Sequence, residues 1–164
     1  MCIRDSSITK LKTELGDSAK IGAGTVLTVE DVSKLKDAGG ELVVSPNCDI
    51  DVIKATKVAG IKSYPGVFTP TECFAALHAG ADGLKFFPGS LIGPIGVNAM
   101  KAVLPAETVT YVVGGADASN FAEWASIGVT GFGIGSALYK AGLVPEEIAK
   151  NAVEICHAYD EAMT

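Results

Sequence analysis

The sequence predicts an α/β fold in which short parallel strands alternate with helices, as in a (β/α)8 TIM barrel. Six apolar runs recur along the chain, and the five steps from Gly22 to Phe132 average about 22 residues, enough for one strand, one helix and short loops. The runs alternate little between apolar and polar residues, which is typical of strands covered on both faces. An open doubly wound sheet would share these features, but the even spacing favours the barrel.

The strands and helices are delimited by recognisable signals. The six predicted strands cover residues 21–26, 42–47, 63–68, 83–88, 110–115 and 131–136. Thr69, Pro70 and Glu72 predict a helix start with a capping box, and Thr28 gives a looser version of the same signal. Glycines are expected to end the helices directly after Ala38, Ala59, Ala79 and Ile127.

The composition is that of one globular domain. The chain has 164 residues, of which 48% are hydrophobic and 20% charged, with a mean hydropathy of +0.34. A net charge of −6 without basic clusters argues against a nucleic-acid partner. No apolar stretch approaches the roughly 18–20 residues needed to cross a bilayer, and the first residues do not resemble a signal peptide.

The cysteines and histidines are widely spaced, at Cys2, Cys48, Cys73, Cys156, His78 and His157. This spacing predicts no metal site, and isolated thiols favour a reducing cytoplasm. Cys73 follows a helix start, where a thiol can become more acidic, but a small core residue is the favoured interpretation. We interpret both histidines as helix-surface or packing residues.

Lys85 is the candidate nucleophile. It lies inside the apolar and aromatic run of residues 83–88, where alternation would place Leu84 and Phe86 on one strand face and Lys85 and Phe87 on the other. Burial favours the neutral amine, which can attack a carbonyl and form a Schiff base. The alternative is a lysine at a strand end that reaches solvent.

Two glycine clusters predict a phosphate site. Gly114 and Gly115 end the fifth predicted strand, and Gly135 and Ser136 end the sixth. In an eight-strand count these are strands 7 and 8, whose following loops often hold phosphate in barrels. Glycine permits close approach of the anion and Ser136 offers a hydroxyl, although glycines can also serve only to form tight turns.

Several motifs, taken in order, make the chain resemble the class I 2-keto-3-deoxy-6-phosphosugar aldolases. The matching segments are residues 22–27, 45–47, 64–66, 69–72, 84–88, 101–105 and 113–115. The resemblance extends from about residue 7 to residue 164. Within the family, Asn47 and Val113 favour the phosphogalactonate over the phosphogluconate epimer as substrate.

The resemblance implies a lyase without metal or organic cofactor. Lys85 would form a Schiff base with 2-dehydro-3-deoxy-6-phosphogalactonate, and cleavage would give pyruvate and glyceraldehyde 3-phosphate. Thr25 and Pro46 match positions near the pyruvyl carboxylate. Gly114, Gly115, Gly135 and Ser136 match the phosphate cradle, and Val113 is a further substrate-binding candidate. The full-length protein is expected to be a cytoplasmic homotrimer.

The N-terminal end departs from the family pattern. We expect residues 1–6 to be an unrelated leader, residues 7–164 to be a partial barrel domain of about six βα units, and about 44 upstream residues to be missing. The family's general acid/base glutamate would lie in that segment. Glu30, Glu41 and Glu72 do not match it, so impaired turnover is expected of this chain.

Other functions remain compatible with the sequence. The substrate could instead be the phosphogluconate epimer or a non-phosphorylated acid such as 4-hydroxy-2-oxoglutarate. A phosphate-binding barrel isomerase or epimerase would share the glycine clusters without using Lys85 as a nucleophile. A non-catalytic barrel would bind phosphosugars weakly and form no covalent adduct.

Overall fold

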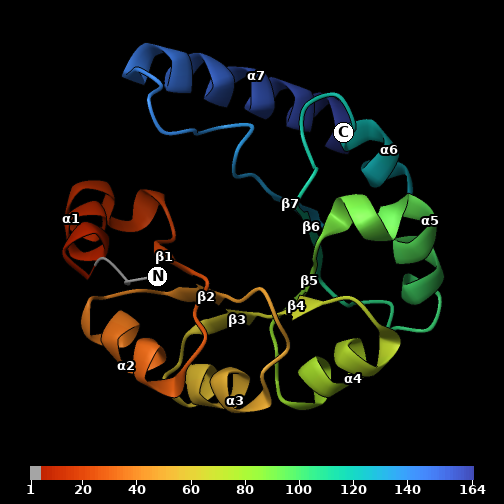
Figure 1. The fold of residues 1–164 in the computed structure, drawn as a ribbon, viewed down its shortest axis with the longest axis horizontal. Coiled ribbons are helices and arrows are strands. Elements are labelled where there is room, and N and C mark those ends of the chain that lie inside the picture. The colour runs from red at the N-terminus through yellow and green to blue at the C-terminus, as the bar shows by residue number, and fades with distance from the viewer. Residues whose placement is uncertain (1–4) are drawn as a thin grey trace. The chain divides into compact units, whose positions relative to one another are not determined.

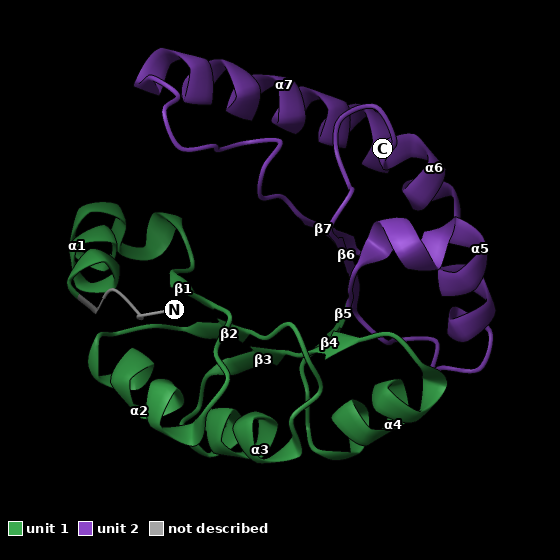
Figure 2. Cartoon of the chain, in the orientation of Figure 1, with its two compact units in different colours: residues 1–85 green, residues 86–164 purple. Residues whose placement is uncertain are grey.

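The computed structural model describes residues 5–164, along which strands and helices alternate (Figure 1). The chain divides into two compact units, residues 1–85 and 86–164 (Figure 2). The leader expected at residues 1–6 lies outside the described residues except for Asp5 and Ser6, with which the first helix begins. Between residues 5 and 164, no helix combines the length and the apolar character required to cross a bilayer.

The elements follow the predicted order. The first unit contains α1 (Asp5–Leu15), η1 (Gly16–Ser18), β1 (Gly22–Gly24), α2 (Val29–Asp37), β2 (Leu42–Val44), α3 (Ile50–Val58), β3 (Lys62–Tyr64), β4 (Gly66–Val67) and α4 (Pro70–His78). Strand β5 (Leu84–Phe86) crosses the boundary between the units. The second unit continues with α5 (Gly89–Lys101), β6 (Thr110–Val113), α6 (Phe121–Ser126), β7 (Gly131–Gly133) and α7 (Pro145–Met163).

Parallel strand pairing confirms the α/β class. In the first unit β1, β2 and β3 are neighbours in that order, with Gly22 opposite Leu42 and Leu42 opposite Lys62. Each of the six predicted runs contains a strand, but the strands are shorter than the runs. The run 63–68 contains the end of β3 and all of β4, and Pro65 between them has no N–H to continue the ladder.

The helix boundaries agree with the sequence signals. The Thr69 hydroxyl accepts the N–H of Glu72, whose carboxylate accepts the N–H of Thr69, so the capping box is confirmed. Thr28 caps α2 through the N–H of Asp31. The glycines expected to end helices all have positive φ, a conformation that glycine adopts without steric cost: Gly39 (84°), Gly60 (72°), Gly80 (95°) and Gly128 (68°).

Each unit has its own apolar packing. The core of the first unit is formed by buried side chains of α1, α2, α3 and the strands beside them: Ile8, Ile21, Ala23, Val26, Val32, Leu35, Val43, Val52 and Ile61. In the second unit β6 and β7 pair in parallel, and α6 packs against α7. There Phe132 of β7 stacks on Phe121 at 4.2 Å between ring centroids and meets the edge of Tyr159 at 6.2 Å.

An ionic cluster supports the strands of the first unit at their amino ends. The Asp82 carboxylate accepts hydrogen bonds from the ammonium groups of Lys57 and Lys62 and, at 2.9 Å, from the N–H of Ser63. Burial acts to raise the pKa of Asp82, but these three donors outweigh it and lower the pKa below 3.8. The ionised form of Asp82 therefore stabilises the folded chain.

Asp82→Asn should destabilise the protein by about 1–2 kcal/mol at neutral pH, because the amide cannot accept these bonds as an anion. A carboxyl whose pKa is lowered by folding contributes its stability above the unfolded pKa, about 3.9, and loses it as the pH falls through the folded value. Urea unfolding at several pH values should show a constant difference from the wild type down to about pH 4 and a shrinking difference below it. A difference that does not shrink in acid would contradict this account.

Candidate active site

Lys85 occupies the middle of β5 and is only 8% exposed. Its neighbours Leu84 and Phe86 are fully buried, and its backbone N–H donates to the carbonyl of Pro65 at 2.9 Å. Removal from water disfavours the ammonium form, so burial lowers the pKa of the Lys85 amine below its ordinary value of 10.5. The interpretation of Lys85 as a solvated surface residue is therefore wrong.

The carboxyl ends of the first strands are tied together beside Lys85. The buried hydroxyl of Ser45, just after β2, donates to the carbonyl of Val26 at 2.7 Å, and its N–H donates to the carbonyl of Tyr64. A Cβ on Gly66 would lie 2.3 Å from the carbonyl oxygen of Pro46, so only glycine fits there. Pro46 thus lies at the same sheet edge as the end of β1 and the start of β4.

Thr25 has an unusual backbone conformation. It follows β1 directly, is exposed, and has φ 61°, in the left-handed region that β-branched residues rarely adopt. Strand β1 ends at Gly24, so Thr25 is the first residue after the strand and not part of its ladder. Strain of this kind concentrates at functional sites, and Thr25 lies at the carboxyl end of β1.

The predicted phosphate residues Gly114 and Gly115 form a tight turn after β6. Their φ values are 86° and 89°, and a Cβ on Gly115 would approach that of Ser90 to 2.6 Å. The Gly114 carbonyl accepts the N–H of Ser90, and the Gly115 carbonyl accepts the side-chain amide of Asn120. Both peptide planes of the turn are thereby fixed.

The structure brings all four residues of the predicted phosphate site, together with Val113, into one pocket of about 350 Å³ within the second unit. This glycine pocket is lined by Phe87, Val113, Gly114, Gly115, Ala116, Asp117, Gly133, Gly135, Ser136, Ala137 and Lys140. Backbone and small side chains dominate its wall, which leaves room for an anion close to the main chain. Sequence reasoning missed Lys140 and Asp117, because neither belongs to a glycine motif.

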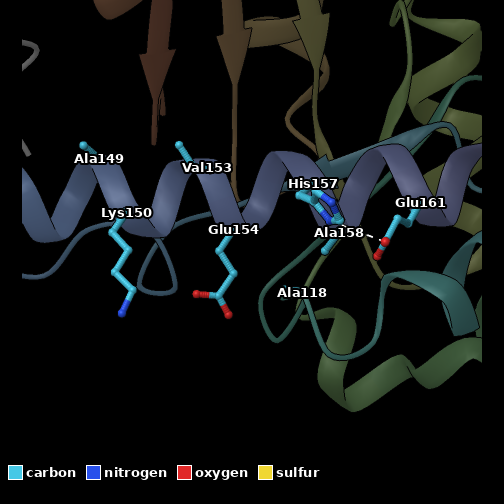
Figure 3. Close-up of a pocket in the computed structure, with 8 residues that line it drawn as sticks. All are labelled: Ala118, Ala149, Lys150, Val153, Glu154, His157, Ala158 and Glu161. Carbon is cyan, nitrogen blue, oxygen red and sulfur yellow. Dashed lines mark ion pairs between the residues drawn. The ribbon is translucent and has the colours of Figure 1, made fainter.

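A larger and more open hollow of about 680 Å³ runs along α7 (Figure 3). The helix contributes Ala149, Val153 and a row of charged or titratable side chains, of which His157 and Glu161 lie 3.5 Å apart. None of the predicted site residues lines this hollow. His157 is exposed on α7 and His78 is exposed at the end of α4, so both are helix-surface residues as expected.

The three carboxylates that the sequence did not assign to catalysis have structural partners. Glu30 pairs with Lys34 along α2, and Glu41 pairs with Lys12 and Lys20. Hydrogen bonds from these two lysines hold the pKa of Glu41 at about 2. Glu72 serves the capping box of α4. These structural partners agree with the prediction that none of the three carboxylates is the catalytic acid or base.

The described residues include a buried cysteine, Cys73, but no group of side chains that could bind a metal ion. Cys73 is completely buried, and burial raises the pKa of its thiol to about 11, so it behaves as a small core residue and the acidic alternative is wrong. Within residues 5–164, no group of three or more His, Cys, Asp or Glu side chains is arranged to hold a metal ion.

Comparison with known proteins agrees with these features. Residues 5–155 match the model of the KDPG and KHG aldolase family. A relative from Rhizobium meliloti (strain 1021), named "Probable 2-dehydro-3-deoxy-6-phosphogalactonate aldolase", is 50% identical over 140 residues, which are 85% of this chain and 66% of the relative. The chain thus spans just under two thirds of that relative's length.

Solved structures share the fold. "Native KDPGal structure" superposes with a TM-score of 0.95 and 43% identity, covering 97% of this chain and 77% of that one. A KDPG aldolase from Legionella pneumophila, whose structure shows pyruvate captured as a covalent carbinolamine, superposes with a TM-score of 0.71 and 26% identity over 97% of this chain and 74% of that one. These likenesses confirm the aldolase-type α/β fold predicted from the sequence, and the chain belongs to the KDPG and KHG aldolase family.

Proposed function

We propose that this chain carries the catalytic lysine of a class I aldolase that cleaves 2-dehydro-3-deoxy-6-phosphogalactonate to pyruvate and glyceraldehyde 3-phosphate. The observation that carries the proposal is Lys85, an amine buried in β5 whose pKa is lowered by burial. Burial favours the neutral form of the amine, which is the form that attacks a carbonyl. The names of the Rhizobium relative and of the solved KDPGal structure support the substrate.

The proposed reaction is a retro-aldol cleavage through an imine. The Lys85 amine adds to the C2 carbonyl, and loss of water from the carbinolamine leaves an iminium ion. The C3–C4 bond then breaks, its electrons pass to the iminium nitrogen to give an enamine, and a base takes the C4 hydroxyl proton as that carbon becomes the aldehyde. Protonation of the enamine at C3 and hydrolysis release pyruvate and restore the amine.

The remaining proposed roles divide between the two ends of the substrate. Thr25 and Pro46 bind the carboxylate beside C2, supported by their place at the sheet edge that Ser45 ties together. Gly114, Gly115, Gly135 and Ser136 bind the phosphate, supported by their convergence in the glycine pocket. Val113 of the same pocket contributes to the choice of sugar epimer. We also propose that the protein works in the cytoplasm as a homotrimer.

Incubation with pyruvate and borohydride should attach a reduced pyruvyl group to Lys85 and not to Lys101, which mass spectrometry of proteolytic peptides can distinguish. Lys101 is a fitting internal control, because burial lowers its pKa too. The labelling rate should rise with pH, with a midpoint below 10.5, since only the neutral amine attacks. Lys85→Met should abolish labelling while circular dichroism shows an intact fold. Label on other lysines alone would refute the proposal.

Gly135→Ala should weaken the binding of 2-dehydro-3-deoxy-6-phosphogalactonate by roughly tenfold to hundredfold, because the methyl group takes space meant for the phosphate. No atom lies within 4 Å of the added Cβ, so the melting temperature should not change. Gly115→Ala serves as a comparison in which stability should change. Its positive φ should make the substitution cost about 1–3 kcal/mol in the free energy of unfolding. If calorimetry gives Gly135→Ala the same affinity as the wild type, the proposal that the phosphate binds in this pocket is refuted.

Cleavage assays with both epimers and with 4-hydroxy-2-oxoglutarate should separate the substrates. Turnover by this chain is expected to be impaired, but the phosphogalactonate compound should still have the highest kcat/KM and the non-phosphorylated acid the lowest. If Val113 helps to choose the epimer, Val113→Thr should lower the ratio of kcat/KM for the phosphogalactonate compound to kcat/KM for the phosphogluconate compound. An unchanged ratio would assign epimer choice to other residues.

A further inference from the structure

The glycine pocket contains one pair of opposite charges whose role the glycine motif does not explain. Among the described residues that line it, Lys140 carries the positive charge and Asp117 the negative one. A phosphate monoester is close to a dianion at neutral pH. Backbone N–H groups can cradle such a ligand, but an uncompensated aspartate at the same wall would repel it.

Asp117 is committed to the turn that precedes α6. Its carboxylate Oδ1 accepts the N–H of Ser119 at 2.9 Å and the Ser119 hydroxyl at 2.6 Å, while its own N–H donates to Asn120. The side chain therefore shapes the loop after β6, but its charge stays at the pocket. The charge that can offset it within the lining is that of Lys140.

Lys140 is held at the pocket by two successive turns. The carbonyl of Gly135 accepts the N–H groups of Leu138 and Tyr139, both at 3.0 Å, which folds the chain back after β7. The carbonyl of Lys140 accepts the N–H of Leu143 in the next turn. The side-chain amide of Asn151 on α7 donates to the carbonyl of Leu138 and fastens this loop to the helix. The backbone position of Lys140 is thus fixed, while its side chain is exposed.

The ammonium of Lys140 has no ion-pair partner within residues 5–164, unlike that of Lys57 or Lys62. It is the positively charged group that a ligand in the glycine pocket would meet among the described lining residues. We propose that Lys140 is a specificity-determining residue, whose ammonium binds the substrate's phosphate and selects phosphorylated over non-phosphorylated 2-keto acids. This inference rests on the proposed function, but it assigns Lys140 no part in imine formation.

The test compares Lys140→Ala and Lys140→Arg with Lys150→Ala. Lys150 is a matched control, because it is also exposed but lies on α7 and lines the other hollow (Figure 3). The measurements are the Kd for inorganic phosphate and for glyceraldehyde 3-phosphate at low and high salt, and the rate of Lys85 labelling by pyruvate and borohydride. Inorganic phosphate reports on the pocket without requiring turnover.

We expect Lys140→Ala to weaken both phosphate ligands roughly tenfold at low salt, with a smaller loss at high salt, where screening already weakens the wild type. Lys140→Arg should restore most of the affinity, Lys150→Ala should match the wild type, and all variants should label with pyruvate equally. Unchanged phosphate affinity in Lys140→Ala, or an equal loss in Lys150→Ala, would overturn the role of Lys140. Failure of the wild type to label with pyruvate would instead overturn the aldolase function, so the two failures are distinguishable.

Discussion

Enclosure of the Lys85 amine by an apolar strand is the constraint on which the chemistry of this chain depends. Leu84 and Phe86 are fully buried on either side, so β5 cannot turn Lys85 toward bulk water without exposing one of them. An ammonium in such surroundings loses hydration, which shifts the equilibrium toward the neutral amine. The same packing that holds the strand in place therefore also lowers the pKa of the amine that we propose as the nucleophile.

The surrounding elements divide their work between the two ends of the strands. At the carboxyl ends, Ser45 and Gly66 bring neighbouring backbones into contact and leave polar groups at one edge. At the amino ends, Asp82 and Glu41 each gather two lysines into ion pairs. Parallel strands make this division natural, because all of them present the same end to the same side. The proposed substrate contacts and the stabilising ion pairs thus lie at opposite ends of the strands.

Much of this arrangement could be predicted from the sequence, because local signals determine it. Apolar runs marked the strands, Thr69 and Glu72 marked a helix start, and the glycine clusters marked the pocket. The rest depends on contacts between distant residues. In the sequence Lys140 resembles any surface lysine. In the structure two turns and the hydrogen bond from Asn151 fix its loop, and it lines the same pocket as Gly135. Likewise, the sequence predicts the run 63–68 as one strand, but the structure has β3 and β4 on either side of Pro65. The missing N–H of Pro65 interrupts the ladder despite the strand propensity of the residues around it.

The left-handed backbone of Thr25 has a consequence for anyone who evolves this protein in the laboratory. Glycine or asparagine would occupy φ 61° at lower conformational cost than a β-branched residue. A screen that rewards only heat resistance therefore favours the loss of the Thr25 hydroxyl, whereas the carboxylate contact proposed for it gives a screen that rewards turnover a reason to retain it. The two kinds of screen should diverge at this position first, which makes position 25 an informative one to sequence in the selected populations.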